Sequence, residues 1–242
     1  MNVAASSQKT ALTLACLLSF APACGGSDPP PKDASVHDAK PTRAEGPTIT
    51  ASSDIGGMNE DDVDAAFTSS VKGLQRCIDM GAKRVEFLGG SVAFLLKIDG
   101  TGRVKDAYLE HSTLGNRPTE QCMLDALRAK SWPKPVGGEL GLARKSFSFD
   151  PPNDVREPIT WDDHDAAPGL KKIASDVKDC KRGNPGHFEA TLYVGTDGKV
   201  LSAGVTPPDS AGEEALDCLV GLLEGASFPS PGSWPAKVTL SL

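Results

Sequence analysis

Two stretches of the chain decide the fold: SVAFLLKIDGTGRVKDAYL (residues 91–109) and HFEATLYVGTDGKVLSAGV (residues 187–205). Each carries apolar residues on both sides of a short Gly- and Asp-containing turn, Asp99-Gly100-Thr101-Gly102 in the first and Gly195-Thr196-Asp197-Gly198 in the second. This pattern is typical of a β-hairpin with a tight turn. We predict strands over residues 92–98 and 104–109, and again over 188–194 and 200–205.

The two stretches belong to a longer internal repeat. Placing residue 91 on residue 187 and continuing without a gap to residue 135 also brings Cys122 onto Cys218 and Trp132 onto Phe228. The identical pairs are Leu96/Leu192, Gly102/Gly198, Val104/Val200, Ala107/Ala203, Cys122/Cys218, Leu127/Leu223, Ser131/Ser227, Pro133/Pro229 and Pro135/Pro231. Self-similarity at one fixed offset indicates a duplicated structural unit.

Helical patterns flank each hairpin. Residues 61–80 place apolar side chains three or four positions apart, as an amphipathic helix does, and residues 167–180 do the same in the second copy. A second helix is expected over 118–130 and 211–224, before an aromatic-Pro-x-Pro segment that ends it. A last strand follows over 143–149 and 236–242. The sequence therefore predicts an α+β fold of two tandem small domains, each helix-strand-strand-helix-strand with a three-stranded antiparallel sheet.

The domain boundaries follow from composition. We predict the first domain over residues 59–151, a linker over 152–165 and the second domain over 166–242. Residues 24–58 are rich in Pro, Asp, Ser, Thr and Ala without apolar periodicity, so they predict a disordered linker. Residues 1–23 combine Lys9, an apolar stretch too short to span a bilayer, and small residues, as a signal peptide does.

The signal peptide has two candidate cleavage sites. Ala23-Cys24-Gly25-Gly26 resembles a bacterial lipoprotein junction, in which Cys24 is lipidated, whereas Ala21-Pro22-Ala23 fits ordinary secretion. We expect the first: an exported protein, lipid-anchored at the outer membrane and facing the periplasm or the cell surface. The alternative is a soluble periplasmic protein. In the lipoprotein case we expect the lipid anchor to be the chain's only contact with a membrane.

Four further cysteines fall two to each copy. An even number of cysteines in an exported protein favours disulfides, although four cysteines allow three connectivities. We predict Cys77–Cys122 and Cys180–Cys218, each joining the first helix of a copy to its second helix.

Taken together, these features resemble the TonB C-terminal domain family, in particular its AgmX/PglI-type branch. The resemblance covers about 90 residues of the first copy and rests on Cys77, the hairpin around Gly102, His111-Ser112-Thr113-Leu114, Cys122, and Trp132-Pro133-x-Pro135-x-Gly137-Gly138 leading to Phe147-Ser148-Phe149. The second copy keeps Cys180, Gly198, Cys218 and Phe228-Pro229-x-Pro231 but has Pro207-Pro208-Asp209 in place of Ser-Thr. The second copy is therefore interpreted as a degenerate member.

The resemblance implies a non-enzymatic, protein-binding function. In this fold an edge strand can pair with an extended peptide of an envelope protein, within a motility, transport or secretion assembly. The last strand of each copy is the candidate edge, with Ala143, Lys145, Phe147 and Phe149 as candidate binding residues in the first. Two alternatives stay open: an envelope enzyme or accessory subunit with a site between the copies, and a purely structural spacer.

Several other functions find little support in the sequence. A formal net charge of −7 and the lack of a basic run argue against nucleic-acid binding. The turn at residues 99–102 is not followed by Gly-Lys-Ser/Thr, so it does not predict a phosphate site. Trp161-Asp162-Asp163-His164-Asp165 could supply metal ligands, but acidic residues just before a helix favour a solvated linker or an N-terminal cap. We expect no metal, cofactor or catalytic residue.

Overall fold

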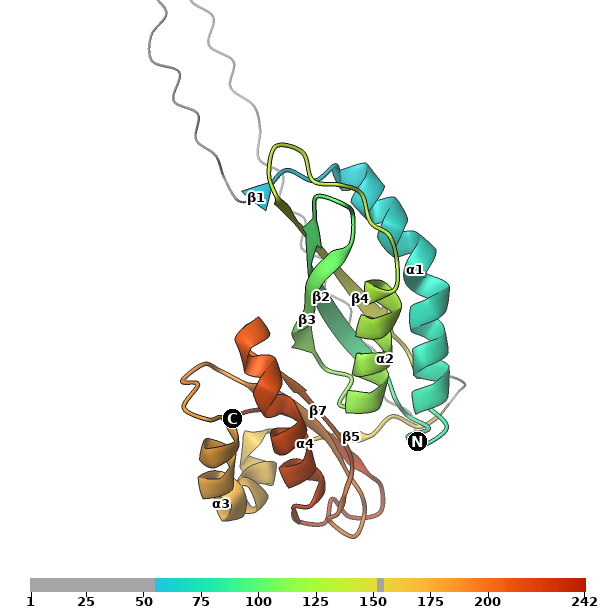
Figure 1. Cartoon of the computed structure of the whole chain (residues 1–242). Helices are drawn as coiled ribbons and strands as arrows, with labels where there is room; N and C mark the ends of the chain where they lie inside the picture. The colour runs from blue at the N-terminus through green and yellow to red at the C-terminus, as the bar shows by residue number, and fades with distance from the viewer. Residues whose placement is uncertain (1–54, 152–154) are drawn as a thin grey trace, which may run out of the picture. The chain divides into compact units, whose positions relative to one another are not determined.

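The computed structural model describes residues 55–151 and 155–242. These residues form helices and two sheets, which confirms the α+β fold (Figure 1). The predicted signal peptide, Cys24 and residues 24–54 of the first linker lie outside the described residues, as do residues 152–154 of the second linker. The two repeats lie within one compact unit that ends at Leu242.

The first repeat has the predicted order of elements. They are α1 (Glu60–Gly81), β2 (Gly90–Asp99), β3 (Val104–Ser112), α2 (Arg117–Arg128) and β4 (Leu140–Phe149). The sheet has the order β1-β4-β2-β3, with β2 antiparallel to both β3 and β4. Helices α1 and α2 lie side by side on one face of it (Figure 1). That face and the helices enclose a core built around Phe67, Leu74 and Phe94.

The second repeat follows the same plan. Its elements are α3 (Asp163–Cys180), β6 (Glu189–Val194), β7 (Val200–Thr206), η1 (Ser210–Ala215), α4 (Leu216–Glu224) and β8 (Ala236–Ser241). The sheet order, β5-β8-β6-β7, matches that of the first repeat. Here α3 and α4 enclose a separate core that includes Phe188 and Leu219.

Each sheet also has a short strand that the sequence pattern does not predict. Strands β1 (Ile55–Gly56) and β5 (Ile159–Thr160) pair in parallel with the first residues of β4 and β8. The predicted three-stranded antiparallel sheet is present in each repeat, and a short parallel strand extends it to four strands. Strands of two residues are too short to show alternation, and main-chain bonds alone define them.

The helix predicted over residues 211–224 consists of two segments in the structure. Its first turn is the 3₁₀ segment η1, and α4 begins only at Leu216. Gly212 lies in that turn, close to the rings of Pro207 and Pro208, and glycine is a weak α-helix former.

The turn glycine shared by the two hairpins has the same function in each. Gly102 and Gly198 have φ of 84° and 79°, a region that favours glycine. Their carbonyls accept hydrogen bonds from the main-chain N–H of Trp132 and Phe228, at 2.8 and 2.9 Å. A Cβ at either glycine would lie 2.4 or 2.3 Å from the carbonyl oxygen of that aromatic residue. The tip of the hairpin is thereby fixed to the segment that follows the second helix, which explains why glycine and an aromatic residue recur together.

Both predicted disulfides are present. Cys77–Cys122 joins α1 to α2 and Cys180–Cys218 joins α3 to α4. Cys77 and Cys180 are buried in their cores, whereas Cys218 is exposed. Two disulfides fit an oxidising compartment outside the cytoplasm.

The acidic segment before α3 is a helix cap. The Asp162 side chain accepts hydrogen bonds from the main-chain N–H of His164 (2.8 Å) and Asp165 (3.1 Å). The Asp165 carboxylate in turn accepts from the N–H of Asp162, which completes a capping box. This confirms the interpretation of the segment as a cap.

None of the helices in residues 55–151 and 155–242 has the length and apolar character needed to cross a membrane.

Candidate functional site

The repeats meet where the open face of the second sheet packs against loops of the first repeat. Open here means the face that carries no helices. Asn116 donates from Nδ2 to Ser202 Oγ at 2.8 Å, and Ser202 donates to the carbonyl of Gly115 at 2.7 Å. Thr191 donates to the carbonyl of Ser112 at 3.3 Å. Asn116, Ser202, Thr191 and Ser112 are all buried, so this contact is a polar, desolvated interface.

Glu120 on α2 is the most deeply buried charged side chain of this interface. It has no exposed surface, and its Oε1 accepts a hydrogen bond from Ser112 Oγ at 2.6 Å. Its Oε2 has no partner, and a Cβ at Gly204 of β7 would come within 2.7 Å of that atom. Burial raises the pKa of Glu120 to about 7, against the opposing effects of the Ser112 hydrogen bond and the positive charge of Arg117.

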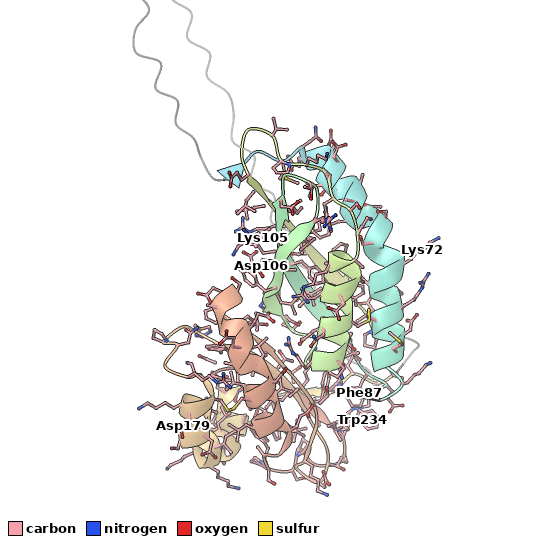
Figure 2. The ribbon with its side chains drawn as sticks, in the orientation of Figure 1. Lys72, Phe87, Lys105, Asp106, Asp179 and Trp234 are labelled. Atoms are coloured by element: carbon pink, nitrogen blue, oxygen red, sulfur yellow. A yellow bond between two sulfur atoms is a disulfide. The ribbon has the colours of Figure 1, made fainter. Side chains whose placement is uncertain are left out.

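A second contact converges on the carbonyl of Gly89, just before β2. Tyr193 donates its hydroxyl to this oxygen at 3.2 Å, and Lys237 donates from Nζ at 2.7 Å. The Lys237 ammonium also lies 5.2 Å from the centroid of the Tyr193 ring. Phe87 packs on the Tyr193 ring, with ring centroids 5.4 Å apart. Trp234 lies next to Phe87 (Figure 2). Burial lowers the pKa of Lys237 to about 8, partly offset by Glu157.

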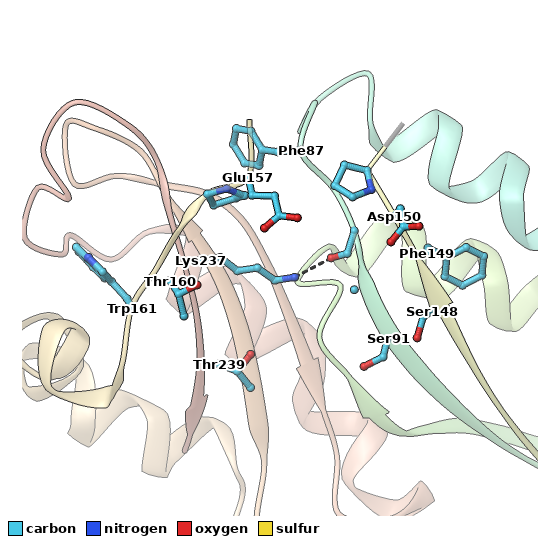
Figure 3. Close-up of a pocket in the computed structure, with 14 residues that line it drawn as sticks. Phe87, Ser91, Ser148, Phe149, Asp150, Glu157, Thr160, Trp161, Lys237 and Thr239 are labelled. Carbon is cyan, nitrogen blue, oxygen red and sulfur yellow. Dashed lines mark hydrogen bonds between the residues drawn. The ribbon is translucent and has the colours of Figure 1, made fainter. Parts of the chain in front are cut away.

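A cleft of about 560 Å³ lies next to this contact (Figure 3). One wall carries Ser91, Ser148, Phe149 and Asp150 from the first repeat, and the other carries Thr160, Trp161 and Thr239 from the second. Glu157 and Lys237 lie between them. The cleft is thus formed jointly by the end of β4, the beginning of β2, and the β5 and β8 strands.

Strand β4 has a free outer edge beside the cleft. Strand β1 covers only Leu140 and Gly141, and no other described strand pairs with the outer side of β4 as far as Phe149. The main-chain N–H and C=O of Ser91 form hydrogen bonds on the β3 side of β2. The main-chain groups of its neighbours Gly90 and Val92 therefore point toward β4. The main-chain groups of their partners in β4, Phe149 and Phe147, point back toward β2.

Alternation along the strand then assigns the free groups. Four residues of β4 have their main-chain N–H and C=O directed away from β2, out from the free edge of the sheet: Leu142, Arg144, Ser146 and Ser148.

The four predicted binding residues of β4 alternate with these four, so their main-chain groups point toward β2. They are Ala143, Lys145, Phe147 and Phe149. Ala143 and Phe149 are buried in the core. Phe147 packs against Phe67 of α1, with ring centroids 6.0 Å apart, and Lys145 forms an ion pair with Asp64 of α1 at 2.8 Å. They therefore support the strand from the helix side, and their main-chain groups face β2. Whether a partner binds this strand stays a prediction.

The corresponding edge in the second repeat is shorter. Strand β5 covers Ala236 and Lys237, and Trp161 N–H donates to the Lys237 carbonyl at 2.9 Å. Beyond β5, the outer side of β8 has no strand partner among the described residues over the stretch from Val238 to Ser241, whose inner side pairs with β6. The longer free edge is in the first repeat.

Sequence reasoning missed Glu120, Asn116, Lys237 and the cleft. Each depends on contacts between residues far apart in the sequence, and none belongs to a motif that either copy shows alone. A signal was present in the register, because Glu120 falls on Leu216 and Asn116 on Gly212 in the second copy. A charged residue in one copy at a position that is apolar in the other indicates a surface specific to that copy.

Within the described parts of the chain, no three His, Cys, Asp or Glu side chains are grouped so that they could hold a metal ion. Comparison of the chain with protein-family models, curated proteins and solved structures gave no match.

Proposed function

We propose that the chain is a non-enzymatic binding protein of the bacterial envelope, and that its first repeat adds an extended peptide of a partner protein to the free edge of β4. The observation that carries the proposal is the unpaired edge between Leu142 and Phe149, since an open strand edge offers a row of main-chain donors and acceptors. The resemblance to TonB C-terminal domains supports the same mode of binding.

The surroundings of the edge are compatible with an added strand. The two basic side chains of the strand are neutralised within the first repeat, Lys145 by Asp64 and Arg144 by Glu110, whose carboxylate lies 2.9 Å from Arg144 Nε. Ser146 and Ser148 are small, so a neighbouring backbone can approach. Unpaired charges and bulky side chains commonly protect edges from pairing, and here both effects are weak.

Replacing Ser148 by proline tests the mode of binding. Proline removes the outward N–H of residue 148 without taking a donor from the β2–β4 ladder, so we expect capture of the peptide-binding partner to fall at least about tenfold, as the loss of a main-chain bond and steric exclusion together predict. The measurement is crosslinking in intact envelopes followed by quantitative mass spectrometry. Ser148→Thr, which keeps the N–H, is the matched control. An identical bound set for the wild type and Ser148→Pro would contradict pairing at this edge.

We also propose that Cys24, outside the described residues, carries the lipid that anchors the protein at the outer membrane. Intact-mass analysis of the mature protein is expected to give a chain that begins at Cys24 and bears acyl groups. Cys24→Ser should move the protein from the membrane fraction to the periplasmic fraction. A mature chain beginning at another residue, without acyl groups, would instead support the alternative of a soluble periplasmic protein.

The rival proposals place a reaction in the cleft or make the chain a spacer. An enzyme would need groups of both repeats to converge on one reacting atom, and the cleft does contain Asp150, Glu157 and Lys237. The ammonium of Lys237, however, is bonded to the Gly89 carbonyl and covers Tyr193, which favours a structural role. The free edge favours binding over a spacer.

A further inference from the structure

We infer that the cleft between the repeats receives a lysine or arginine side chain of the peptide that pairs with β4. This inference rests on the proposed function and adds to it the chemical character of the partner: an extended segment with a basic residue next to its paired stretch.

The free edge of β4 is continuous with the cleft. Ser148 and Phe149 form the end of the free edge and also line the cleft (Figure 3). A strand added along β4 therefore passes over the cleft at this end. Since side chains alternate between the two faces of a strand, every second side chain of the peptide is on the same face as Ser148. At the end of β4 that face looks into the cleft, toward Thr239 of β8.

The charged groups that line the cleft favour a cation. Asp150 and Glu157 both line the cleft, and neither carboxylate forms an ion pair with a side chain in residues 55–151 or 155–242. The neighbouring Arg156 lies over the Trp234 ring, 5.1 Å from its centroid. The remaining charge, Lys237, is bonded to the Gly89 carbonyl. The cleft thus contains two carboxylates without an ion pair and one ammonium that is already hydrogen-bonded to a carbonyl. The excess of negative charge favours binding of a cation.

The size and the surface type of the cleft also suit such a side chain. A cleft of about 560 Å³ has room for a long side chain. Trp161 and Pro158 line the cleft and offer partly exposed apolar surface for the methylene groups of lysine or arginine, and an aromatic face also attracts a cation. The same combination already occurs in the protein, where the ammonium of Lys237 lies over Tyr193.

Binding of synthetic peptides to the protein from Cys24 to Leu242, with Cys24 replaced by serine, tests the inference. The probes are fluorescently labelled ten-residue peptides of alternating threonine and valine with lysine, arginine or glutamate at either end. Anisotropy titrations at low salt should give about fivefold tighter binding of the best basic peptide than of its glutamate counterpart, the effect expected of partly exposed charge pairs. The preference should fall in 0.5 M salt.

Two double variants locate the preference. In Asp150→Asn/Glu157→Gln the ratio of the two affinities is expected to fall below twofold. The control Asp179→Asn/Glu224→Gln makes the same change in net charge near the C-terminal ends of α3 and α4. The Asp179 side chain points away from its helix (Figure 2). This control should keep the wild-type ratio of the two affinities.

The outcomes separate this inference from the proposed function. If Ser148→Pro abolishes binding of basic and acidic peptides alike, but the cleft variant keeps the wild-type preference, edge pairing stands and the cleft inference is wrong. An absence of preference in the wild type also overturns the inference. If none of the peptides binds, or if Ser148→Pro has no effect on binding, both the inference and the proposed function are overturned.

Discussion

Replacing Glu120 by glutamine is expected to stabilise the protein at pH 8 and to remove the part of its loss of stability between about pH 4.5 and 7 that Glu120 causes; Glu213, whose pKa is also raised by burial, would keep its own part. The folded protein holds the Glu120 proton up to a pKa of about 7, whereas an unfolded chain releases it near 4.5. Because the folded state binds more protons in this window, the stability that Glu120 contributes is fully present below about pH 4.5 and is lost as the pH rises through 7. The shift corresponds to about 3 kcal/mol in the wild type.

Glutamine is uncharged at every pH in this range, so it avoids the free-energy cost of the buried Glu120 carboxyl. It introduces a second cost, that of an unpaired amide group. Its amide would leave an N–H group without an acceptor beside Gly204, at about 1–2 kcal/mol. We therefore expect a net gain of about 1–2 kcal/mol at pH 8 and a small loss at pH 5.

Urea unfolding at several pH values between 4.5 and 8 measures both effects. The exposed Glu139→Gln serves as the matched control and should keep the wild-type slope. Carboxyl groups whose pKa is lowered, such as Asp106 beside Lys97, act with the opposite sign and below pH 4, outside this window. A Glu120→Gln variant with an unchanged pH slope would show that the carboxyl is not protonated within the folded interface.

Removing the Cys77–Cys122 disulfide is expected to destabilise the first repeat by about 4 kcal/mol, because the bond closes a loop with a sequence separation of 45 residues. A protein of this size is commonly stable by only about 5–15 kcal/mol. The Cys77→Ala/Cys122→Ala variant should therefore unfold at a much lower urea concentration than the wild type. The loss includes the contacts of Cys77, which is buried in the core between α1 and α2.

The second disulfide provides the comparison. Cys180→Ala/Cys218→Ala opens a loop of similar length, with a separation of 38 residues, so chain entropy alone predicts nearly the same loss. Cys218 is exposed, and this bond should react first with a mild reductant, as thiol mapping by mass spectrometry would show. Losses below about 1 kcal/mol in both variants would contradict a stabilising role.

Features encoded in short stretches could be predicted from the sequence. The alternation around Asp99-Gly100 predicts β2 and β3, and the register between the copies predicts the cysteine pairs, because the same helices recur at the same offset. The acidic run at Asp162 predicts a cap, since its partners lie within three residues.

Features that depend on the second repeat could not be predicted in this way. Glu120 is an ordinary exposed helix residue by pattern, and in the structure it is buried, with Gly204 of the second repeat packed against its carboxylate. The orientation of β4 is a similar case. Apolar Phe147 and Phe149 identify the strand and its core face, but the free main-chain groups belong to the alternate residues, which include Ser146 and Ser148. Hydropathy reports which side chains are buried and carries no direct information about which main-chain groups are paired.

The packing of the second sheet's open face on the first repeat also determines how many partners one chain can engage. Duplication commonly creates a bivalent protein whose two weak sites act together through avidity. Here the second copy uses that face for contacts such as Asn116–Ser202, and its own edge beyond β5 is short. Under the proposed function the two repeats would form one composite site, and we expect titration to saturate at one peptide per chain. Avidity would then require several copies of the protein gathered at one membrane surface by the proposed lipid anchor.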